Sequence, residues 1–281
     1  MILLADSGGT KTHWCLLGSD GVSRSFFSGG MHPLVHSDEA LQHTLTTEVL
    51  PALGTDSAGQ VIFYGAACSS AERIAKVNRH LSAVFPDASI QVLHDMLGVA
   101  RSVCGNDPGM VAILGTGSNA AYYDGDEVYS HVPSLGYVLG DEGSGAYIGK
   151  QWIRAVLYGE APADLAARFL KETQVDKETV LRKVYIEPNA NAFLASFCPF
   201  LHNHLHDAFV HDLVLTSFRL FLQRIVKKHE VWRELSLGCV GSVAFHFKPV
   251  LEEAAGLEGV RLGEVIRDPM EGLVRYYSRK S

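Results

Sequence analysis

The sequence predicts an α/β protein built from a repeated arrangement of strands and helices. Short apolar runs alternate with amphipathic stretches through the first hundred residues, as expected of a sheet that contains parallel strands. The order of parts at the N-terminus then returns near residue 110. In both places a turn rich in glycine and hydroxyl side chains directly follows an apolar run.

The first half of the chain supplies strands and helices in alternation. Five short apolar runs bounded by turn-forming residues are expected to be strands: Ile2–Ala5, Trp14–Leu17, Val22–Phe27, Val61–Gly65 and Ile90–Leu93. Three stretches with apolar residues at helical spacing are expected to be helices: Asp38–Leu50, Ser70–Val84 and Asp95–Val103.

The segment MVAILGTGSNAAYYDGDEVY begins the repeat. It reads as a strand, a Gly-Thr-Gly-Ser turn, a second strand, an Asp-Gly turn and a third strand. The N-terminal stretches ILLA, DSGGTKT, HWCLLG, SDG and VSRSFF have the same order, although the two segments share no long identity. A chance likeness between two β-hairpins is the alternative that this pattern leaves open.

Helical periodicity dominates residues 142–233. One apolar stripe there is expected to contain Trp152, Ile153, Val156 and Leu157. A final α/β piece follows in LSLGCVGSVAFHF and VRLGEVI. A closing helix is expected in DPMEGLVRYY, with Asp268 as its cap and Pro269 at its start.

The composition excludes several classes of protein. Hydrophobic residues make up 47% and charged residues 20% of the 281 residues, which argues against disorder. A net charge of −7 without a basic stripe argues against a nucleic-acid-binding surface. No apolar run approaches the roughly 18 residues that a membrane helix needs. Scattered cysteines and an N-terminus that soon turns acidic predict a cytoplasmic protein without a signal peptide.

The stretch ADSGGTKT is the first candidate ligand-binding loop. Glycines allow backbone N–H groups to approach a phosphate closely, hydroxyls and a lysine add hydrogen-bond donors, and Asp6 could act on a cation. The alternative is a tight Gly-Gly hairpin with a polar tip. The loop is not a Walker A motif, because no glycine stands four residues ahead of a Gly-Lys-Ser/Thr sequence.

Asp95 follows the apolar run IQVL and is the candidate for acid–base chemistry. A carboxylate at the C-terminal end of a parallel strand lies where open α/β sheets place their ligands. The alternative is that Asp95 serves only as the N-cap of a helix beginning at Met96.

The ordered set ADSGGTKT, LHDMLG, ILGTGSN, GDEGSG and GCVGSV resembles the acetate-and-sugar kinase/actin superfamily. Within it, the N-acetylglucosamine kinases and the related BadF/BadG/BcrA/BcrD ATPases are the most similar, over residues 2–277. The resemblance implies two ribonuclease H-like, actin-type domains that form a clamshell around a nucleotide cleft for ATP and Mg²⁺. The N-terminal domain would span residues 1–107, with a closing helix at 269–281 returning to it. The C-terminal domain would span residues 108–268, with a helical insertion at about 142–233.

The resemblance also implies roles for individual residues. The implied ATP-binding residues are Asp6, Gly8, Gly9, Thr10, Lys11, Thr12, Gly115, Thr116, Gly117, Ser118, Gly241, Ser242 and Val243. The implied sugar-binding residues are Asp141, Asn119, Ser69 and His32. Asp95 would be the general base, and Asp6 would act on Mg²⁺ through bound water. A strand-to-helix turn with positive φ is the alternative for Gly238 and Gly241, and a helix cap is the alternative for Asp141.

The implied function is that of an ATP-dependent kinase acting on the primary hydroxyl of an amino sugar, with N-acetylglucosamine as the expected acceptor. Two departures bear on the acceptor: His32 stands where the family tends to carry Asn, and Ser134-Leu135 stand where many members carry Gly-Trp. One alternative is an ATPase coupled to a protein partner, as in BadF-type activators, but without their paired cysteines for an iron–sulfur cluster. Another is a regulator that has lost catalysis. A homodimer is compatible with the resemblance.

The run HNHLHDAFVHD gathers four histidines, at His202, His204, His206 and His211. On one continuous helix, His202 and His206 would share a face with Asp207 and His211 nearby, a spacing that can bind zinc. The alternative, which is the commoner case for such a run, is a helix face that lies in solvent or in a dimer interface.

Overall fold

The computed structural model describes residues 1–18, 21 and 23–279. The chain divides into two compact units, Met1–Asp107 with Pro269–Ser281, and Pro108–Asp268, which we call the first and the second unit. Ser19 and Asp20 of the expected SDG turn, and Val22 at the start of an expected strand, lie outside the described residues.

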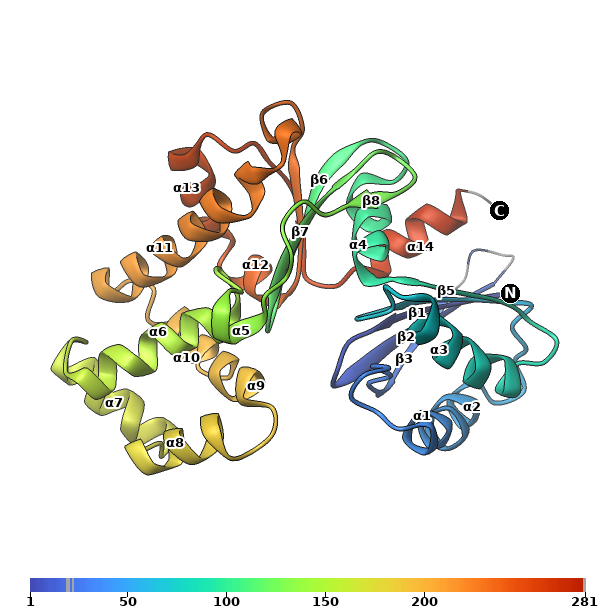
Figure 1. Cartoon of the computed structure of the whole chain (residues 1–281), viewed down its shortest axis with the longest axis horizontal. Helices are drawn as coiled ribbons and strands as arrows, with labels where there is room; N and C mark the ends of the chain where they lie inside the picture. Colours follow the sequence, from blue (N-terminus) through green and yellow to red (C-terminus); the bar gives the residue numbers. More distant parts are fainter. Residues whose placement is uncertain (19–20, 22, 280–281) are drawn as a thin grey trace. The chain divides into compact units, whose positions relative to one another are not determined.

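A mixed five-stranded sheet organises the first unit (Figure 1). Its strands are β1 (Ile2–Ser7), β2 (Lys11–Leu17), β3 (Ser23–Gly29), β4 (Gln60–Gly65) and β5 (Ser89–His94). Their order in the sheet is β3-β2-β1-β4-β5. Strand β2 runs antiparallel to both of its neighbours, β1 and β3, whereas β4 and β5 run parallel to β1. The C-terminal ends of β1, β4 and β5 therefore meet at one edge of the sheet.

The helices of the first unit are α1 (Asp38–Thr44), a π-helical turn (Leu45–Val49), α2 (Leu50–Leu53), α3 (Ala71–Val84), α4 (Asp95–Cys104) and α14 (Met270–Ser278). Ser37 and Ser70 cap α1 and α3, because their hydroxyls accept hydrogen bonds from the N–H groups of Ala40 and Arg73. The expected helix at 38–50 is present, but it contains a π-helical turn and continues to Leu53.

The core of the first unit packs apolar side chains of the sheet against α1, α2 and α3. Leu3 and Phe63 from the central strands are fully buried, as are Leu41 and Val77 from the helices. Burying a side chain of this size contributes roughly 1.5–3 kcal/mol. Trp14 is also buried, and its indole N–H donates a 2.9 Å hydrogen bond to the Ser28 hydroxyl.

Helix α14 lies beside α4 in the first unit (Figure 1). Gly272 of α14 is so close to α4 that a Cβ atom there would overlap the backbone carbonyl of Ser102. Nearby, the hydroxyls of Tyr64 and Tyr277 are 2.6 Å apart, and Arg101 donates to them at 2.9 and 3.3 Å. These contacts bind the C-terminal helix to β4 and α4.

The N-terminus of α14 differs from the expectation by one position. Pro269 is the N-cap and no side chain makes a capping hydrogen bond, so the cap expected at Asp268 is one residue too early.

The second unit repeats the sheet topology of the first. Its strands are β6 (Gly109–Leu114), β7 (Ser118–Tyr123), β8 (Val128–Tyr129), β9 (Leu237–Val240) and β10 (Leu262–Ile266), in the order β10-β9-β6-β7-β8. Strand β7 runs antiparallel to both of its neighbours, β6 and β8, whereas β9 and β10 run parallel to β6. The predicted α/β class and the repeated architecture are thereby confirmed.

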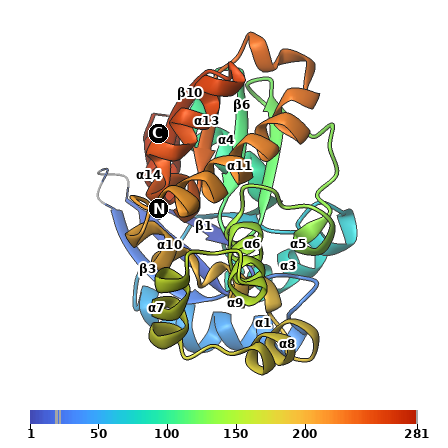
Figure 2. The same cartoon turned by 90° about the vertical axis from the view of Figure 1, so that its left-hand side faces the viewer.

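In the part of the chain that the structure describes, the second unit contains more helices than the first. They are α5 (Gly136–Leu139), α6 (Gly145–Tyr158), α7 (Ala163–Thr173), α8 (Lys177–Tyr185), α9 (Ala190–Ala195), α10 (Cys198–Asn203), α11 (Ala208–Arg224), 3₁₀ turns at Val226–Lys228 and Glu230–Arg233, α12 (Ser242–His246) and α13 (Lys248–Glu258). Figures 1 and 2 show α6, α9 and α10 side by side. Within the described ranges, no helix has the length and apolar character to cross a membrane.

An aromatic cluster forms the helical part of this core. The rings of Trp152, Phe169 and Phe200 lie 5.1 to 5.8 Å apart between centroids. Ile153 and Val156 are buried with them, whereas Leu157, expected on the same stripe, is 39% exposed. Each helical residue turns by about 100°, so Leu157 points away from the buried face that Val156 occupies.

The histidine run does not lie on one helix. Helix α10 ends at Asn203, and a turn separates it from α11. The prediction of one continuous helix, on which the zinc hypothesis depends, is therefore wrong. The ring of His204 hydrogen-bonds the Phe200 carbonyl at 2.8 Å, and His211 pairs with Glu253 at 3.0 Å. Among the described residues, no group of three or more His, Cys, Asp or Glu side chains could hold a metal ion.

Candidate active site

The turn between β1 and β2 has open space beside its glycines. The Gly8 N–H donates to the Lys11 carbonyl at 3.0 Å, which closes the turn. Neither Gly8 nor Gly9 has a positive φ, and a Cβ atom at Gly9 would meet no described atom within 4 Å. Packing of the described chain therefore does not require glycine here, whereas the close approach of a ligand would.

Gly30 supports this turn from behind. A Cβ atom at Gly30 would lie 2.6 Å from the backbone carbon of Gly9 and 2.7 Å from the Gly8 carbonyl oxygen, so only glycine fits. The Ser7 hydroxyl accepts a 3.1 Å hydrogen bond from the Met31 N–H. The GGMHP stretch thus fixes the position of the turn, a role that the sequence did not reveal.

The polar side chains of the turn divide into exposed and buried groups. Thr10 and Lys11 are exposed. Thr12 is fully buried, and its hydroxyl lies 2.8 Å from the Ser7 hydroxyl and donates to the Gly29 carbonyl at 3.1 Å. Its hydroxyl shapes the turn from within and has no exposed surface for the ATP contact expected of it. Asp6 is partly buried on β1, just before the turn.

Asp95 lies where β5 gives way to α4. His94 is the N-cap of α4, and Asp95 is the first residue of the helix. Asp95 therefore does not occupy the N-cap position, as it would if it served only as a helix cap. The Asp95 Oδ1 atom accepts a 2.8 Å hydrogen bond from the Met96 N–H, and the His94 Nδ1 atom lies 3.1 Å from the same oxygen. The side chain of Asp95 is nevertheless 23% exposed to solvent.

The electrostatic surroundings of Asp95 suit a base. Burial raises the pKa of the Asp95 carboxyl, while His94, the Met96 N–H and His32 oppose part of that rise. A carboxylate with a raised pKa accepts a proton more readily than an ordinary one.

His32 and the segment after β4 lie around Asp95. Burial lowers the pKa of His32, and the negative charge of Asp95 acts against that change. The Leu34 N–H donates to the His32 Nδ1 atom at 3.3 Å, so the neutral ring carries its proton on Nε2. Burial also raises the pKa of the Cys68 thiol to about 11, with a contribution from Asp95. Ser69, the next residue, is exposed.

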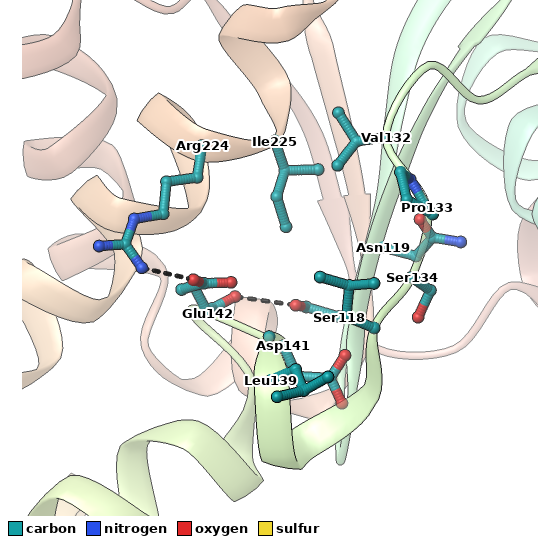
Figure 3. A pocket seen from close by; sticks show the side chains of 12 residues that line it. Ser118, Asn119, Val132, Pro133, Ser134, Leu139, Asp141, Glu142, Arg224 and Ile225 are labelled. Atoms are coloured by element: carbon teal, nitrogen blue, oxygen red, sulfur yellow. Dashed lines mark hydrogen bonds and ion pairs between the residues drawn. The ribbon is translucent and has the colours of Figure 1, made fainter.

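In the second unit, the structure gathers several predicted residues in one pocket of about 170 Å³ (Figure 3). Ser118, Asn119 and Asp141 line it, together with Ser134 and Leu135. Ser134 and Leu135, one of the two departures from the family pattern, therefore border the same pocket as the proposed sugar-binding carboxylate. His32, the other departure, belongs to the first unit.

Asp141 is held in an unusual backbone conformation. Its φ of +58° lies in the left-handed region, which non-glycine residues adopt rarely outside constrained sites. A Cβ atom at Gly117 would come within 3.1 Å of the Asp141 Oδ2 atom, so glycine at position 117 leaves room for this carboxylate. Burial raises the pKa of Asp141, whereas a hydrogen bond from the Ser118 N–H lowers it.

Backbone hydrogen bonds join the second phosphate-binding candidate, Gly115–Ser118, to the loop that carries Asp141. The Gly145 N–H donates to the Gly115 carbonyl at 2.8 Å, and the Ala146 N–H donates to the Thr116 carbonyl at 3.1 Å. A Cβ atom at Gly115 would meet no described atom within 4 Å, as at Gly9. Each of the two Gly-rich turns thus has open space beside a glycine whose φ is not positive.

Gly241 connects β9 to α12. Its φ is +133°, and a Cβ atom would overlap the Leu114 carbonyl, so the turn itself requires glycine. Gly238 lies within β9 without a positive φ, and the turn alternative is wrong for that residue. Ser242 is exposed, whereas the side chain of Val243 is buried in the core and leaves only its backbone for a ligand.

Two further residues, Glu142 and Arg224, were not singled out from the sequence. The Glu142 side chain is 9% exposed, and Arg224 donates to it at 2.8 Å (Figure 3). Glu142 stands within the GDEGSG motif, which could have drawn attention to it, but nothing around Arg224 in the sequence signals the contact.

These arrangements fit phosphate and acid–base chemistry. The turns beside Gly9 and Gly115, where a Cβ atom would meet no described atom within 4 Å, present backbone to an approaching anion, and Thr10 and Lys11 add exposed donors. Asp6, beside the first turn, carries carboxylate oxygens, which are ligands that Mg²⁺ prefers.

The comparisons with solved structures agree with this fold. The putative N-acetylglucosamine kinase of Porphyromonas gingivalis is 41% identical, with a TM-score of 0.95 and 99% of each chain covered. The chain belongs to this N-acetylglucosamine kinase-like family. The resemblance expected from the motifs is thereby confirmed, as is the two-domain actin-like ATPase fold.

Two less similar solved proteins share the fold. The putative N-acetylglucosamine kinase of Chromobacterium violaceum is 18% identical to this N-acetylglucosamine kinase-like chain, with a TM-score of 0.75 and 98% of each chain covered. A ROK family glucokinase from Streptomyces griseus, solved with glucose and AMPPNP, is 12% identical with a TM-score of 0.55, over 99% of this chain and 100% of that one. No protein-family model and no curated protein sequence matches the chain.

Proposed function

We propose that the chain is an ATP-dependent sugar kinase that phosphorylates the primary hydroxyl of an amino sugar, with N-acetylglucosamine as its acceptor. The family supports sugar phosphorylation, since its member from Porphyromonas gingivalis is named as a putative kinase of that sugar. The observation that carries the chemistry is Asp95, a partly exposed carboxylate at the C-terminal end of β5 whose pKa is raised by burial.

In the proposed reaction, Asp95 accepts the proton of the sugar hydroxyl while the hydroxyl oxygen attacks the γ-phosphorus of ATP. The bond from that phosphorus to the β–γ bridging oxygen breaks, and ADP leaves. Mg²⁺, when bound, neutralises charge on the phosphate oxygens, and Asp6 would hold it through water.

The other predicted residues would bind and orient the two substrates. The turns at Gly8–Lys11 and Gly115–Ser118 would hold the phosphates through backbone N–H groups, and Gly241–Val243 would contact the adenosine. Asp141 and Asn119, which line one pocket, would bind sugar hydroxyls, and so would Ser69 and His32.

A panel of hexoses and amino sugars, incubated with ATP and Mg²⁺, tests this proposal. Phosphosugar and ADP should form in equal amounts with N-acetylglucosamine, and ³¹P NMR should identify a phosphate on the primary hydroxyl. ADP formation that no sugar stimulates would contradict the proposal and favour the ATPase alternative, which no observation on the chain now supports. The scattered cysteines fit a cytoplasmic site of action, and gel filtration would test whether the chain forms the homodimer with which the resemblance is compatible.

A further inference from the structure

An ion pair between a buried carboxylate and an exposed arginine lies directly beside the proposed sugar-binding carboxylate. Glu142 follows Asp141 in the chain, and its side chain is 9% exposed. Arg224 donates to it at 2.8 Å and borders the same pocket as Asp141 (Figure 3). A carboxylate buried to this extent is stable only when it is paired or hydrogen-bonded.

Helix α11 supports the loop of Asp141 at two points. Arg224 is the last residue of α11, where a cation is favoured by the helix dipole, and it reaches Glu142. One turn earlier, the Cβ atom of Phe221 is so near Gly143 that a Cβ atom on Gly143 would lie 2.9 Å from it. The loop is therefore held against α11 by an ionic contact and by packing.

The same loop is tied to the strand side of the pocket. The Glu142 carbonyl accepts a 2.8 Å hydrogen bond from the Ser118 hydroxyl, and the Ser144 N–H donates to the Asp141 carbonyl at 3.0 Å. Asp141 keeps its left-handed backbone between these anchors. A strained conformation persists only where its surroundings hold it.

We infer that Arg224 is a positioning residue that holds Asp141 in place for the sugar through its ion pair with Glu142. The inference rests on the proposed function for the identity of the ligand, but not for the contact itself. Without Arg224, the Glu142 carboxylate would be buried beside Asp141 without its ion-pair partner, although the charge of Lys150 would still act on it. Movement of Glu142 toward water would then carry Asp141 with it.

Arg219 offers a matched control on the same helix. It also donates at 2.8 Å to a buried carboxylate, that of Glu258, which keeps Gln223 and Lys227 as partners when Arg219 is removed. Arg219→Met and Arg224→Met each remove one arginine of α11, and only Arg224 borders the pocket of Asp141.

The test combines hydrogen–deuterium exchange with steady-state kinetics. In Arg224→Met, exchange at residues 140–146 should rise roughly tenfold, and the KM for N-acetylglucosamine should rise roughly tenfold with an ATP KM within about twofold of wild type. Arg224→Lys should recover part of the sugar KM, and Arg219→Met should change neither quantity. Unchanged exchange in a folded Arg224→Met, or equal effects of the two Met variants, would overturn the inference.

The exchange measurement separates this inference from the proposed function. If the wild-type protein phosphorylates no sugar, the proposed function fails, while exchange at residues 140–146 still decides whether Arg224 holds the loop.

Discussion

The Ser118 hydroxyl donates a 2.8 Å hydrogen bond to the Glu142 carbonyl, and so joins the end of the Gly-Thr-Gly-Ser turn to the loop that carries Asp141. Two backbone hydrogen bonds, from Gly145 to Gly115 and from Ala146 to Thr116, make the same connection. The candidate phosphate-binding and sugar-binding loops of the second unit are therefore one connected structure, and a change in one should disturb the other.

Gly117→Val tests that connection. A side chain at position 117 would press on the Asp141 carboxylate, since even a Cβ atom would lie 3.1 Å from its Oδ2. We expect the affinities for both ATP and sugar to fall by roughly tenfold, because overpacking of this kind costs about 1–3 kcal/mol. Calorimetry on the folded variant checks both ligands. Loss of ATP affinity alone would show that the loops act separately.

Gly272→Ala tests how α14 is held to α4. The added methyl group would overlap the Ser102 carbonyl, so the helices would have to separate. The free energy of unfolding should fall by about 1–3 kcal/mol. Gly256→Ala in α13 is the control, because a Cβ atom there meets no described atom within 4 Å. Equal stability of the two variants in urea would argue against tight packing at Gly272.

Glu258 gives a pH-dependent contribution to stability. Hydrogen bonds from Lys227, Arg219 and Gln223 lower its pKa to about 2, against 4.5 for an ordinary glutamate. Because the folded-state pKa is the lower one, the contribution is complete above the ordinary value and is lost as the pH falls toward 2. Glu258→Gln should cost roughly 1.5–3 kcal/mol at pH 7.

Urea denaturation at pH 7 and near pH 2 checks the sign of this effect. The difference in unfolding free energy between wild type and Glu258→Gln should shrink at the lower pH. A difference that is constant with pH would show that the charge of Glu258 contributes nothing.

The pH dependence of catalysis reports on Asp95. Because the base must be ionised and burial raises its pKa, kcat/KM should fall on the acid side at a pH above the ordinary aspartate value of 3.8. His94 lowers the pKa of Asp95, so His94→Gln should move this acid limb to a higher pH. A limb that stays in place in His94→Gln would mean that another group, such as Asp141, controls the profile.

Much of the fold could be predicted because the strands are short, apolar and bounded by turn formers. All five strands expected in the first half of the chain are present, although β2 begins at Lys11 rather than Trp14. Helix interruptions were harder to foresee. The polar run at His202–His206 is compatible with a helix, and only the packed structure shows that α10 ends at Asn203.

The site was predictable where its residues adjoin in sequence and not where distant segments meet. The glycines at positions 8, 9, 115 and 117 stand directly after strands, which made them visible. The contact of Arg224 with Glu142 spans 82 residues, and the support of Gly9 by Gly30 crosses two strands, so neither leaves a local pattern. Burial of the Thr12 hydroxyl likewise depends on Ser7 and Gly29, which its own sequence neighbours do not reveal.

The most direct measurement is the turnover rate of Asp95→Asn with N-acetylglucosamine, ATP and Mg²⁺. Asparagine keeps the size of the side chain and its oxygen can still accept the hydrogen bond from the Met96 N–H, but it cannot accept a proton at neutral pH. Both substrates should still bind and the melting temperature should hold, while kcat falls by about 10²–10⁴-fold. A folded Asp95→Asn protein with near wild-type kcat would contradict the assignment of Asp95 as the base.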